Sequence, residues 1–352
     1  AGLFQVFFWI TQDNRVSLIE TSFEKVESLS YSPFEGYDKK VLSPEQIEED
    51  VSMLSHFTTK LRTYSTADAK VILEATSKTD IPIDLGIWIS GDHKENHLEI
   101  QRALKLLEKY PDNIANVIVG NETLLRADLE EEELFAYIDF VAEFTNKPIT
   151  CAETWDVWER IPDLAKHVDF ITIHILPYWE KVPIDRFNDF IIEKYTLVEK
   201  LFPYTKINIG ETGWPSHGYN NNNAVPSLKN QAVAIRGFIN LASEKGWDYN
   251  IVEAFDQQWK GYDEGNVGQY WGIFSSNRSL KFSLSGDIEL NQYWLYQMIA
   301  AIIIGALLTL YGLRNQRLNI SHALAYAIAA QGMAFGIVMA VIYPFANYMN
   351  FG

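Results

Sequence analysis

The chain has 352 residues, of which 47% are apolar and 14% aromatic, which excludes a disordered acidic segment and allows a large folded domain. The formal net charge of −17 argues against nucleic acid as a partner, because a nucleic-acid binder needs a basic surface. The single cysteine, Cys151, excludes an internal disulfide framework, and we expect it to pack in the core.

The first predicted element is a short apolar run from Leu3 to Ile10. A run of this length cannot span a bilayer. Two interpretations stay open, namely the outer end of a spanning helix in a longer parent protein and an ordinary packed segment. We therefore treat residues 1–25 as a separate N-terminal segment.

Short β-like runs alternate with longer helix-like runs over residues 26–285, which is typical of parallel βαβ units. The predicted strands are Glu27–Phe34, Lys60–Tyr64, Ile83–Ile89, Asn116–Gly120, Pro148–Cys151, Asp169–Ile175, Lys206–Gly210 and Tyr249–Phe255. This number of units predicts the α/β class and a (β/α)8 TIM barrel. The alternative, a doubly wound open sheet, usually carries a glycine-rich phosphate loop after its first strand, and residues 30–36 do not resemble one.

The first helix of the barrel has the clearest sequence signal. Ser43–Gln46 has the pattern of a capping box with Pro44 at the first helical position. Apolar residues then recur at helical spacing, at Ile47, Val51 and Leu54.

Residues 293–346 differ abruptly in composition from the barrel. Trp294–Leu313 and Ala323–Tyr343 carry no Asp, Glu, Lys or Arg and are long enough to span a bilayer, so we predict two transmembrane helices. The connection between them contains Arg314 and Arg317, and the positive-inside rule then places this loop in the cytoplasm. We therefore expect a protein of the cytoplasmic (inner) membrane with its barrel on the extracytoplasmic side. Two buried core helices are the alternative interpretation.

Two glutamates follow apolar strands at equivalent points. Glu122 comes just after Asn116–Gly120, and Glu211 comes just after Lys206–Gly210, the fourth and seventh predicted strands. Active sites of (β/α)8 barrels lie at the carboxyl ends of the strands, where these two side chains would face each other. Cleavage of a glycosidic bond needs one carboxyl group as proton donor and a second that attacks or stabilises the anomeric carbon, and a pair about 5 Å apart implies retention.

The segments Val119–Glu122 and Gly210–Ser216 resemble glycoside hydrolase family 17, a β-1,3-glucanase family of retaining (β/α)8 barrels. Further segments resemble its bacterial branch in the same order along the chain, namely Ser30–Phe34, Leu61–Ser65, His174–Glu180, Glu253–Asp256 with Trp259 and Lys260, and Trp271–Phe274. The resemblance covers about residues 26–282.

The resemblance implies that Glu122 is the general acid/base and Glu211 the nucleophile. It also implies that Asn121 bonds the sugar 2-hydroxyl and that Tyr64, Tyr178 and Lys260 line the reacting subsite.

Two tryptophans, Trp179 and Trp259, are the best candidates for stacking on sugar rings, because aromatic side chains after strand ends can cover a sugar face. One position departs from the family. Gln257 stands where the family commonly has a glutamate, which removes a negative charge near the site. We expect Gln257 to be one of the substrate-binding residues.

We expect neither a cofactor nor a metal ion. His93 and His97 have the spacing of a zinc-binding helix, but the glutamate of that motif and an obvious third ligand are missing.

Two function hypotheses follow. The first is a membrane-anchored hydrolase or transglycosylase that acts on a β-glucan oligo- or polysaccharide in extracytoplasmic glucan synthesis or remodelling, and the resemblance suggests a glycosyltransferase domain in a longer parent protein. The alternative is a non-catalytic module that binds or guides glucan for a membrane synthase, although a binder has no need of both carboxylates.

Overall fold

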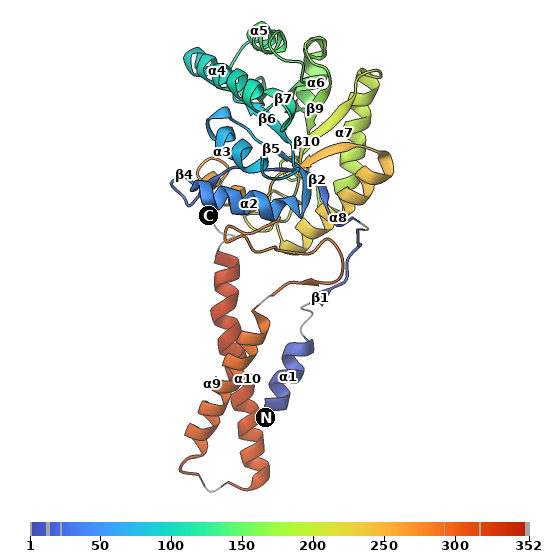
Figure 1. Ribbon diagram of the computed structural model, residues 1–352. Helices are drawn as coiled ribbons and strands as arrows, with labels where there is room; N and C mark the ends of the chain where they lie inside the picture. The colour runs from blue at the N-terminus through green and yellow to red at the C-terminus, as the bar shows by residue number, and fades with distance from the viewer. Residues whose placement is uncertain (1, 12–14, 22, 292, 317, 349–352) are drawn as a thin grey trace. The chain divides into compact units, whose positions relative to one another are not determined.

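The computed structural model of the chain describes residues 2–11, 15–21, 23–291, 293–316 and 318–348. The chain divides into two compact units, which are described separately (Figure 1). The larger unit is Ile19–Ser285, and the other combines Ala1–Leu18 with Gly286–Gly352.

The larger unit is built around a closed barrel of parallel strands. In chain order the strands are β2 (Val26–Ser30), β5 (Thr58–Arg62), β6 (Ile83–Ile87), β7 (Ile114–Asn121), β8 (Ile149–Thr154), β9 (Ile171–His174), β10 (Ile207–Thr212) and β11 (Asp248–Ile251). The pairing of Ile251 with Leu29 closes the ring between β11 and β2. The predicted TIM barrel is confirmed.

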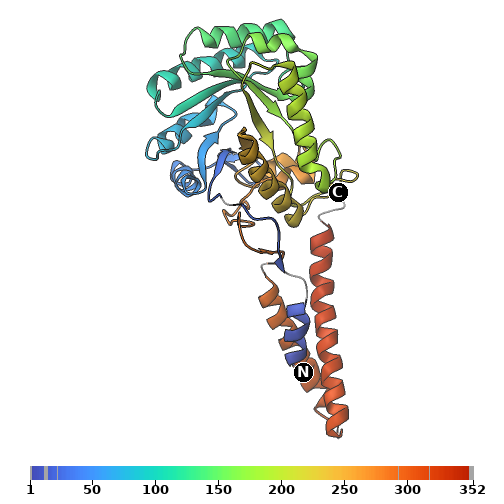
Figure 2. The ribbon, with the colours of Figure 1, turned by 90° about the vertical axis from the view of Figure 1, so that its right-hand side faces the viewer.

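Helices cover the outside of the barrel, as Figure 2 shows. They are α2 (Pro44–Ser55), α3 (Thr66–Thr76), α4 (His93–Lys109), α5 (Glu131–Ala142), α6 (Trp155–Arg160), α7 (Phe187–Leu201) and α8 (Leu228–Lys245). Every residue of β6 and β10 is buried. One face of each strand packs in the interior of the barrel, and the other face packs against the surrounding helices.

The predicted start of α2 is largely confirmed. Ser43 caps the helix by accepting a hydrogen bond from the Gln46 backbone N–H at 3.2 Å, and Ile47, Val51 and Leu54 are buried. The reciprocal half of the predicted capping box is different, because the Gln46 side chain donates to Asp50 instead.

Two strand boundaries differ from the prediction. The first strand ends at Ser30, and Phe34 belongs instead to an antiparallel hairpin of β3 (Phe34–Glu35) and β4 (Lys40–Val41). Pro33 explains this break, because proline has no N–H for the strand ladder. The last strand ends at Ile251, and Phe255 forms only an isolated bridge with Phe274.

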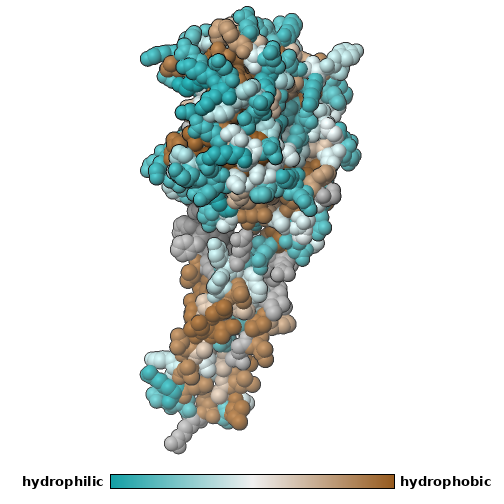
Figure 3. Space-filling view, viewed as in Figure 1, coloured by the Kyte–Doolittle hydropathy of each residue, from teal (hydrophilic) through white to brown (hydrophobic). Residues whose placement is uncertain are grey.

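The smaller unit contains three helices, α1 (Gly2–Thr11), α9 (Trp294–Leu313) and α10 (Ile320–Tyr348). The segments Trp294–Leu313 and Ile320–Val341 are long and apolar enough to cross a membrane. Apolar side chains dominate the surface of this part of the chain in Figure 3, whereas the barrel surface is largely polar. Arg317, one of the two cations of the predicted loop, lies outside the described residues.

A polar contact joins α1 to α10 inside this unit. Gln5, fully buried, donates a hydrogen bond through its amide nitrogen to the backbone oxygen of Gln331 and accepts one from Trp9 Nε1 at 3.1 Å. The ring of Trp9 packs edge-on against Phe335 at 5.3 Å. The short N-terminal run is therefore a helix packed on α9 and α10, and polar side chains are a common means of joining apolar helices.

Candidate active site

Two glutamates meet at the carboxyl ends of the barrel strands. Glu122 directly follows β7 and has a left-handed backbone with φ of 54°, whereas Glu211 lies within β10 near its end. One carboxylate oxygen of each lies within 4.8 Å of the other and of a ring nitrogen of His174. The structure therefore brings together the two carboxylates that the sequence singled out, although β8 and β9 separate their strands in the barrel.

His174, at the end of β9, is the direct partner of Glu122. The two Nη atoms of Arg62 lie 3.3 Å from His174 Nε2, and a guanidinium can only donate hydrogen bonds, so Nε2 acts as acceptor. The ring proton is then assigned to Nδ1, which donates to Glu122 Oε1 at 2.7 Å. Burial favours the neutral form of Glu122, but the hydrogen bond from His174 and the charges of Arg126 and Arg62 outweigh it and lower the pKa of Glu122.

Glu211 has different partners. The hydroxyl of Tyr64 donates to Glu211 Oε1 at 2.8 Å, and Nη1 of Arg62 lies 3.6 Å from the same oxygen. Burial and the negative charge of Glu211 raise the pKa of Tyr64 well above its usual value, so the phenol stays neutral and remains a donor. Glu211 is only 8% exposed, which leaves it open to a ligand only from the barrel mouth.

Arg62, at the end of β5, connects both carboxylates. It is buried, and it donates to Asn121 Oδ1 at 2.6 Å and to the backbone oxygen of Gly210 as well as to His174. The bond from Arg62 occupies the amide oxygen of Asn121, which leaves the Asn121 amide nitrogen as the group available to a ligand. Arg62 and His174 have no predicted role in the sequence, although a charged or polar side chain at the end of an apolar strand is a signal for a site residue.

Glu153 supports the turn that carries Glu122. It is fully buried at the end of β8 and accepts hydrogen bonds from the backbone N–H groups of Leu124 at 2.7 Å and Leu125 at 3.3 Å. Burial, with a smaller contribution from the charge of Glu122, raises the pKa of Glu153 to about 7. This buried carboxyl group is also not predictable from a local motif.

Lys260 lies on the β11 side of the site. Its ammonium group is 2.9 Å from Glu253 Oε1, and both side chains are nearly inaccessible to solvent. Burial opposes the charge of Lys260, but Glu253 and Glu264 outweigh it and raise the pKa of Lys260. Burial raises the pKa of Glu253 to about 7 in spite of Lys260.

Two of the predicted substrate contacts, Tyr178 and Gln257, are buried and hydrogen-bonded within the protein. Tyr178 is fully buried, and its hydroxyl donates to the backbone oxygen of Tyr219 at 2.7 Å. Gln257 is 2% exposed, with its amide nitrogen bonded to the Ser32 oxygen and its amide oxygen bonded to Trp259 Nε1. Both residues therefore support the loops of the mouth, and neither presents a free polar group to a ligand.

A nearby carboxyl group does exist on the β11 side, despite Gln257. Glu264 is electrostatically coupled to Glu211 and Glu122, and burial together with these charges raises the pKa of Glu264. The negative charge whose loss we inferred from Gln257 is thus present near the site on a different residue.

The two tryptophans expected to stack on sugar rings are both partly exposed. The ring of Trp179 lies 5.9 Å from that of Trp271 in a stacked arrangement, and the ring of Trp259 lies 6.0 Å from that of Phe34. Lys39 Nζ lies over Trp259, 4.1 Å from its ring centre. Each tryptophan is therefore held by a neighbour.

The cluster of Glu122, His174 and Glu211 also has residue types that bind metal ions. Arg62, however, lies 3.6 Å from Glu211 and 3.3 Å from His174, so a permanent cation already offsets part of the negative charge of this cluster. A divalent ion there would be repelled by the guanidinium.

His93 contacts Tyr137 at 3.0 Å and lies 3.7 Å from Glu133, while His97 Nδ1 contacts the His93 backbone oxygen. These contacts involve one face of α4 and its neighbour α5, on the outside of the barrel.

The family comparison matches the barrel. The BtgE/BtgC glycoside hydrolase domain corresponds to residues 28–272. The chain belongs to the BtgE/BtgC glycoside hydrolase family. The resemblance to family 17 is thereby confirmed.

Proteins similar to this glycoside hydrolase include fungal enzymes. It is 28% identical over 260 residues to a glucan 1,3-beta-glucosidase of Schizosaccharomyces pombe, covering 68% of this chain and 80% of the relative. The family 17 β-1,3-glucanosyltransferase of Rhizomucor miehei is similar in structure, with a TM-score of 0.66, 26% identity, and coverage of 72% of this chain and 94% of that chain. An endo-laminarinase from Formosa, at 19% identity, shares the fold with a TM-score of 0.64 over 71% of this chain and 83% of that chain.

Proposed function

We propose that this glycoside hydrolase is a membrane-attached retaining enzyme that acts on β-1,3-glucan, with Glu211 as nucleophile and Glu122 as general acid/base. The observation that carries the proposal is the separation of the two carboxylates, whose oxygens come within 4.8 Å. Retaining glycosidases hold their carboxyl groups about 5–5.5 Å apart, whereas inverting enzymes need room for a water molecule between them.

The first half-reaction follows from the partners of each group. Glu211 attacks the anomeric carbon while the protonated Glu122 donates its proton to the departing oxygen, so the glycosidic bond breaks as the Glu211 ester forms. Tyr64 supplies a hydrogen bond and Arg62 a positive charge at Glu211 Oε1, so both groups can hold this carboxylate in place for the attack.

The second half-reaction reverses these roles. Glu122, now ionised, removes the proton of an acceptor hydroxyl, whose oxygen attacks the anomeric carbon and releases Glu211. His174 suits this step, because its N–H donates to the carboxylate form of Glu122. Asn121 is expected to bond the 2-hydroxyl of the reacting sugar, as the family resemblance implies.

The substrate class is supported by the relatives and by the charges of the chain. The named relatives are a glucan 1,3-beta-glucosidase and a β-1,3-glucanosyltransferase, and a related transferase structure contains laminaritriose. A neutral polysaccharide is compatible with a net charge of −17, which would repel an anionic one. Trp179 and Trp259 are the proposed stacking surfaces, and Lys260 the proposed polar wall.

The acceptor determines whether the enzyme hydrolyses or transfers. We favour transfer in the synthesis or remodelling of glucan, together with a glycosyltransferase domain in a longer parent protein. The test is to incubate the purified full chain with short β-1,3-glucans and separate the products by length. Products longer than the donor are expected, and a mixture of shorter products alone would restrict the enzyme to hydrolysis.

The membrane location rests on α9 and α10, whose spans have the length and composition of transmembrane helices. We propose that both cross the cytoplasmic membrane and that the Arg314 loop faces the cytoplasm, with the barrel outside. Single cysteines introduced in the Arg314 loop and at Ser243 on α8 can be labelled in intact cells with a reagent that does not cross the membrane, which tests this orientation. Labelling at Ser243 but not in the loop is expected. The opposite result would contradict the proposed orientation.

A further inference from the structure

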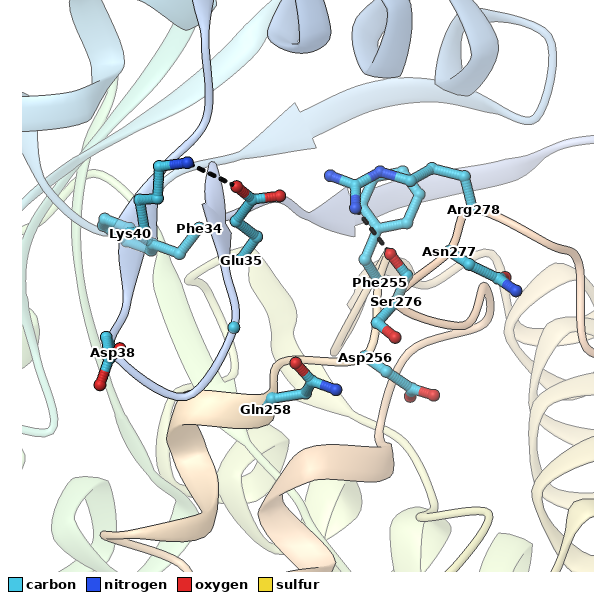
Figure 4. Close-up of a pocket in the computed structure, with 11 residues that line it drawn as sticks. Phe34, Glu35, Asp38, Lys40, Phe255, Asp256, Gln258, Ser276, Asn277 and Arg278 are labelled. Atoms are coloured by element: carbon cyan, nitrogen blue, oxygen red, sulfur yellow. Dashed lines mark hydrogen bonds and ion pairs between the residues drawn. The ribbon is translucent and has the colours of Figure 1, made fainter.

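Two of the open pockets of the barrel unit differ in how their polar groups are partnered. The pocket in Figure 4 lies beside the β3–β4 hairpin. Its charged groups are paired within the protein, Lys40 with Glu35 at 3.3 Å and Arg278 with Asp50 through hydrogen bonds of 3.0 and 2.9 Å. A pocket whose charges are already paired offers little to an ion.

The second pocket has a volume of about 410 Å³ and lies between α4 and α5, on the outside of the barrel (Figure 1). These helices follow β6 and β7, which are neighbours in the barrel. The pocket is lined by His93 and His97 from α4 and by Glu133 and Tyr137 from α5. Imidazole and carboxylate groups are ligands of divalent transition-metal ions, so this pocket has the residue types of a metal site.

Glu133 supplies the third ligand that the spacing within α4 lacks. His93 and His97 lie one turn apart on the same face of α4, and Glu133 faces them from the first turn of α5. Glu133 Oε1 lies 3.7 Å from His93 Nε2. Because zinc–ligand bonds are about 2.0–2.2 Å long, two ligand atoms up to about 4.2 Å apart can share one ion. The observed separation therefore admits an ion between them.

The other ring nitrogen of each histidine already has a partner. His97 Nδ1 lies 2.5 Å from the backbone oxygen of His93, and a carbonyl can only accept, so the proton of the neutral ring is assigned to Nδ1. Nε2 of His97 then keeps a free lone pair. His93 Nδ1 contacts the Tyr137 hydroxyl at 3.0 Å, and this oxygen can accept the ring proton when Nε2 binds an ion. Histidines that bind metals almost always donate their other N–H in this way.

His97 is the ligand that must move to complete the set. Among the described residues, only the two glutamates and the histidine of the active site already have three ligand atoms within 4.8 Å of one another. His97 is exposed, so its side chain can turn toward an ion that His93 and Glu133 hold. The acidic first turn of α5, with three consecutive glutamates, attracts a cation to this place.

We propose that His93, His97 and Glu133 bind one divalent transition-metal ion, and that this ion is zinc. Two imidazoles and one carboxylate are a common zinc ligand set, and solvent takes the fourth position. The ion joins α4 to α5 and thereby stabilises the sector of the barrel that contains β7. The site is separate from the paired carboxylates, so the proposal does not depend on the proposed function.

The test is calorimetric titration of Zn²⁺ into the purified full chain in detergent, without a polyhistidine tag. His93→Ala, His97→Ala and Glu133→Gln each remove one ligand from an exposed position. His167→Ala is the matched control, because this histidine pairs with Asp139 and does not line the pocket. Thermal unfolding with and without Zn²⁺ gives a second measurement for each variant.

The wild type and His167→Ala are expected to bind one Zn²⁺ per chain. Each of the three ligand variants should bind at least about tenfold more weakly, since even the loss of an outer partner of a metal ligand costs about 10–100-fold. With Zn²⁺ at about 100 times the dissociation constant, the wild-type Tm should rise by roughly 5 °C, and the ligand variants should lose most of this rise.

Glu211→Gln distinguishes this site from the active site, where a histidine and two glutamates also meet. It should bind Zn²⁺ as the wild type does. Loss of binding in Glu211→Gln would place the ion at the active site and overturn the proposal. Undiminished binding in any of the three ligand variants, or a wild type whose dissociation constant for Zn²⁺ exceeds about 1 mM, would also overturn it.

Discussion

The two carboxylates of the site differ in what surrounds them, although both are glutamates at strand ends. Glu122 accepts a hydrogen bond from the imidazole of His174, whereas Glu211 accepts one from the phenol of Tyr64. Arg62 reaches both, directly to Glu211 and through His174 to Glu122. An imidazole next to Glu122 is suited to a group that gains and loses a proton, whereas the phenol and the guanidinium supply a hydrogen bond and a positive charge to Glu211.

The largest effect on turnover is expected from replacing Glu211, the proposed nucleophile. Glu211→Gln keeps the shape of the side chain but cannot attack the anomeric carbon, and turnover of β-1,3-glucan should fall by about 10⁴-fold or more. Glu193→Gln, on the exposed face of α7, is the matched control and should retain turnover. Wild-type turnover in Glu211→Gln would contradict the nucleophile and favour a binding module.

Glu122→Gln tests the proposed role of Glu122 as general acid. Turnover of glucan should fall by about 10²–10⁴-fold, because the departing sugar oxygen then leaves without a proton. An aryl donor with a good leaving group needs no such proton, so its first step should remain fast. Mass spectrometry of the intact protein should then detect the glycosyl enzyme, and an equal loss on both substrates would contradict the acid role.

His174→Asn tests what distinguishes Glu122 from Glu211. His174 lowers the pKa of Glu122 against the effect of burial, so its removal should raise that pKa. Glu122 would then keep its proton to higher pH, and the alkaline limb of kcat/KM should shift upward. The maximum should fall by roughly tenfold, in line with the loss of one hydrogen bond of about 1–2 kcal/mol.

The matched control for this experiment is His167→Asn, because His167 pairs with Asp139 away from the site. Its pH profile should match that of the wild type. A downward shift of the alkaline limb in His174→Asn would contradict the assignment.

The smallest effect concerns stability. Glu153 has a pKa of about 7 in the folded chain against 4.5 ordinarily, so the folded state binds more protons than the unfolded state between these values. Its contribution to stability is therefore present at low pH and is lost as pH rises from about 4.5 to 7, with an upper bound of about 3 kcal/mol.

Glu153→Gln should flatten this decline, as measured by thermal unfolding of the full chain in detergent between pH 5 and pH 8. The exposed Glu143→Gln is the control and should keep the wild-type slope. An unchanged slope in Glu153→Gln would show that Glu153 is ionised throughout.

Most of the barrel could be predicted from the sequence because buried parallel strands are continuous apolar runs. All eight strands were located this way, and Glu122 and Glu211 were found because each directly follows such a run. The apolar spans of α9 and α10 were equally accessible, since length and composition alone define them.

The hydrogen-bond partners of Tyr178 and Gln257, which lie in loops, could not be predicted. The hydroxyl of Tyr178 donates to the backbone oxygen of Tyr219, 41 residues away. Gln257 is bonded to Ser32, 225 residues away. The direction of a loop side chain depends on such distant partners, and a local motif contains no information about them.

The sequence alone determined the barrel, the two strand-end glutamates of the candidate site and the apolar helices, because periodicity, strand ends and hydropathy are local properties. Only the tertiary structure decided the proton network, since Arg62 and His174 are 112 residues apart and meet through the closure of the barrel.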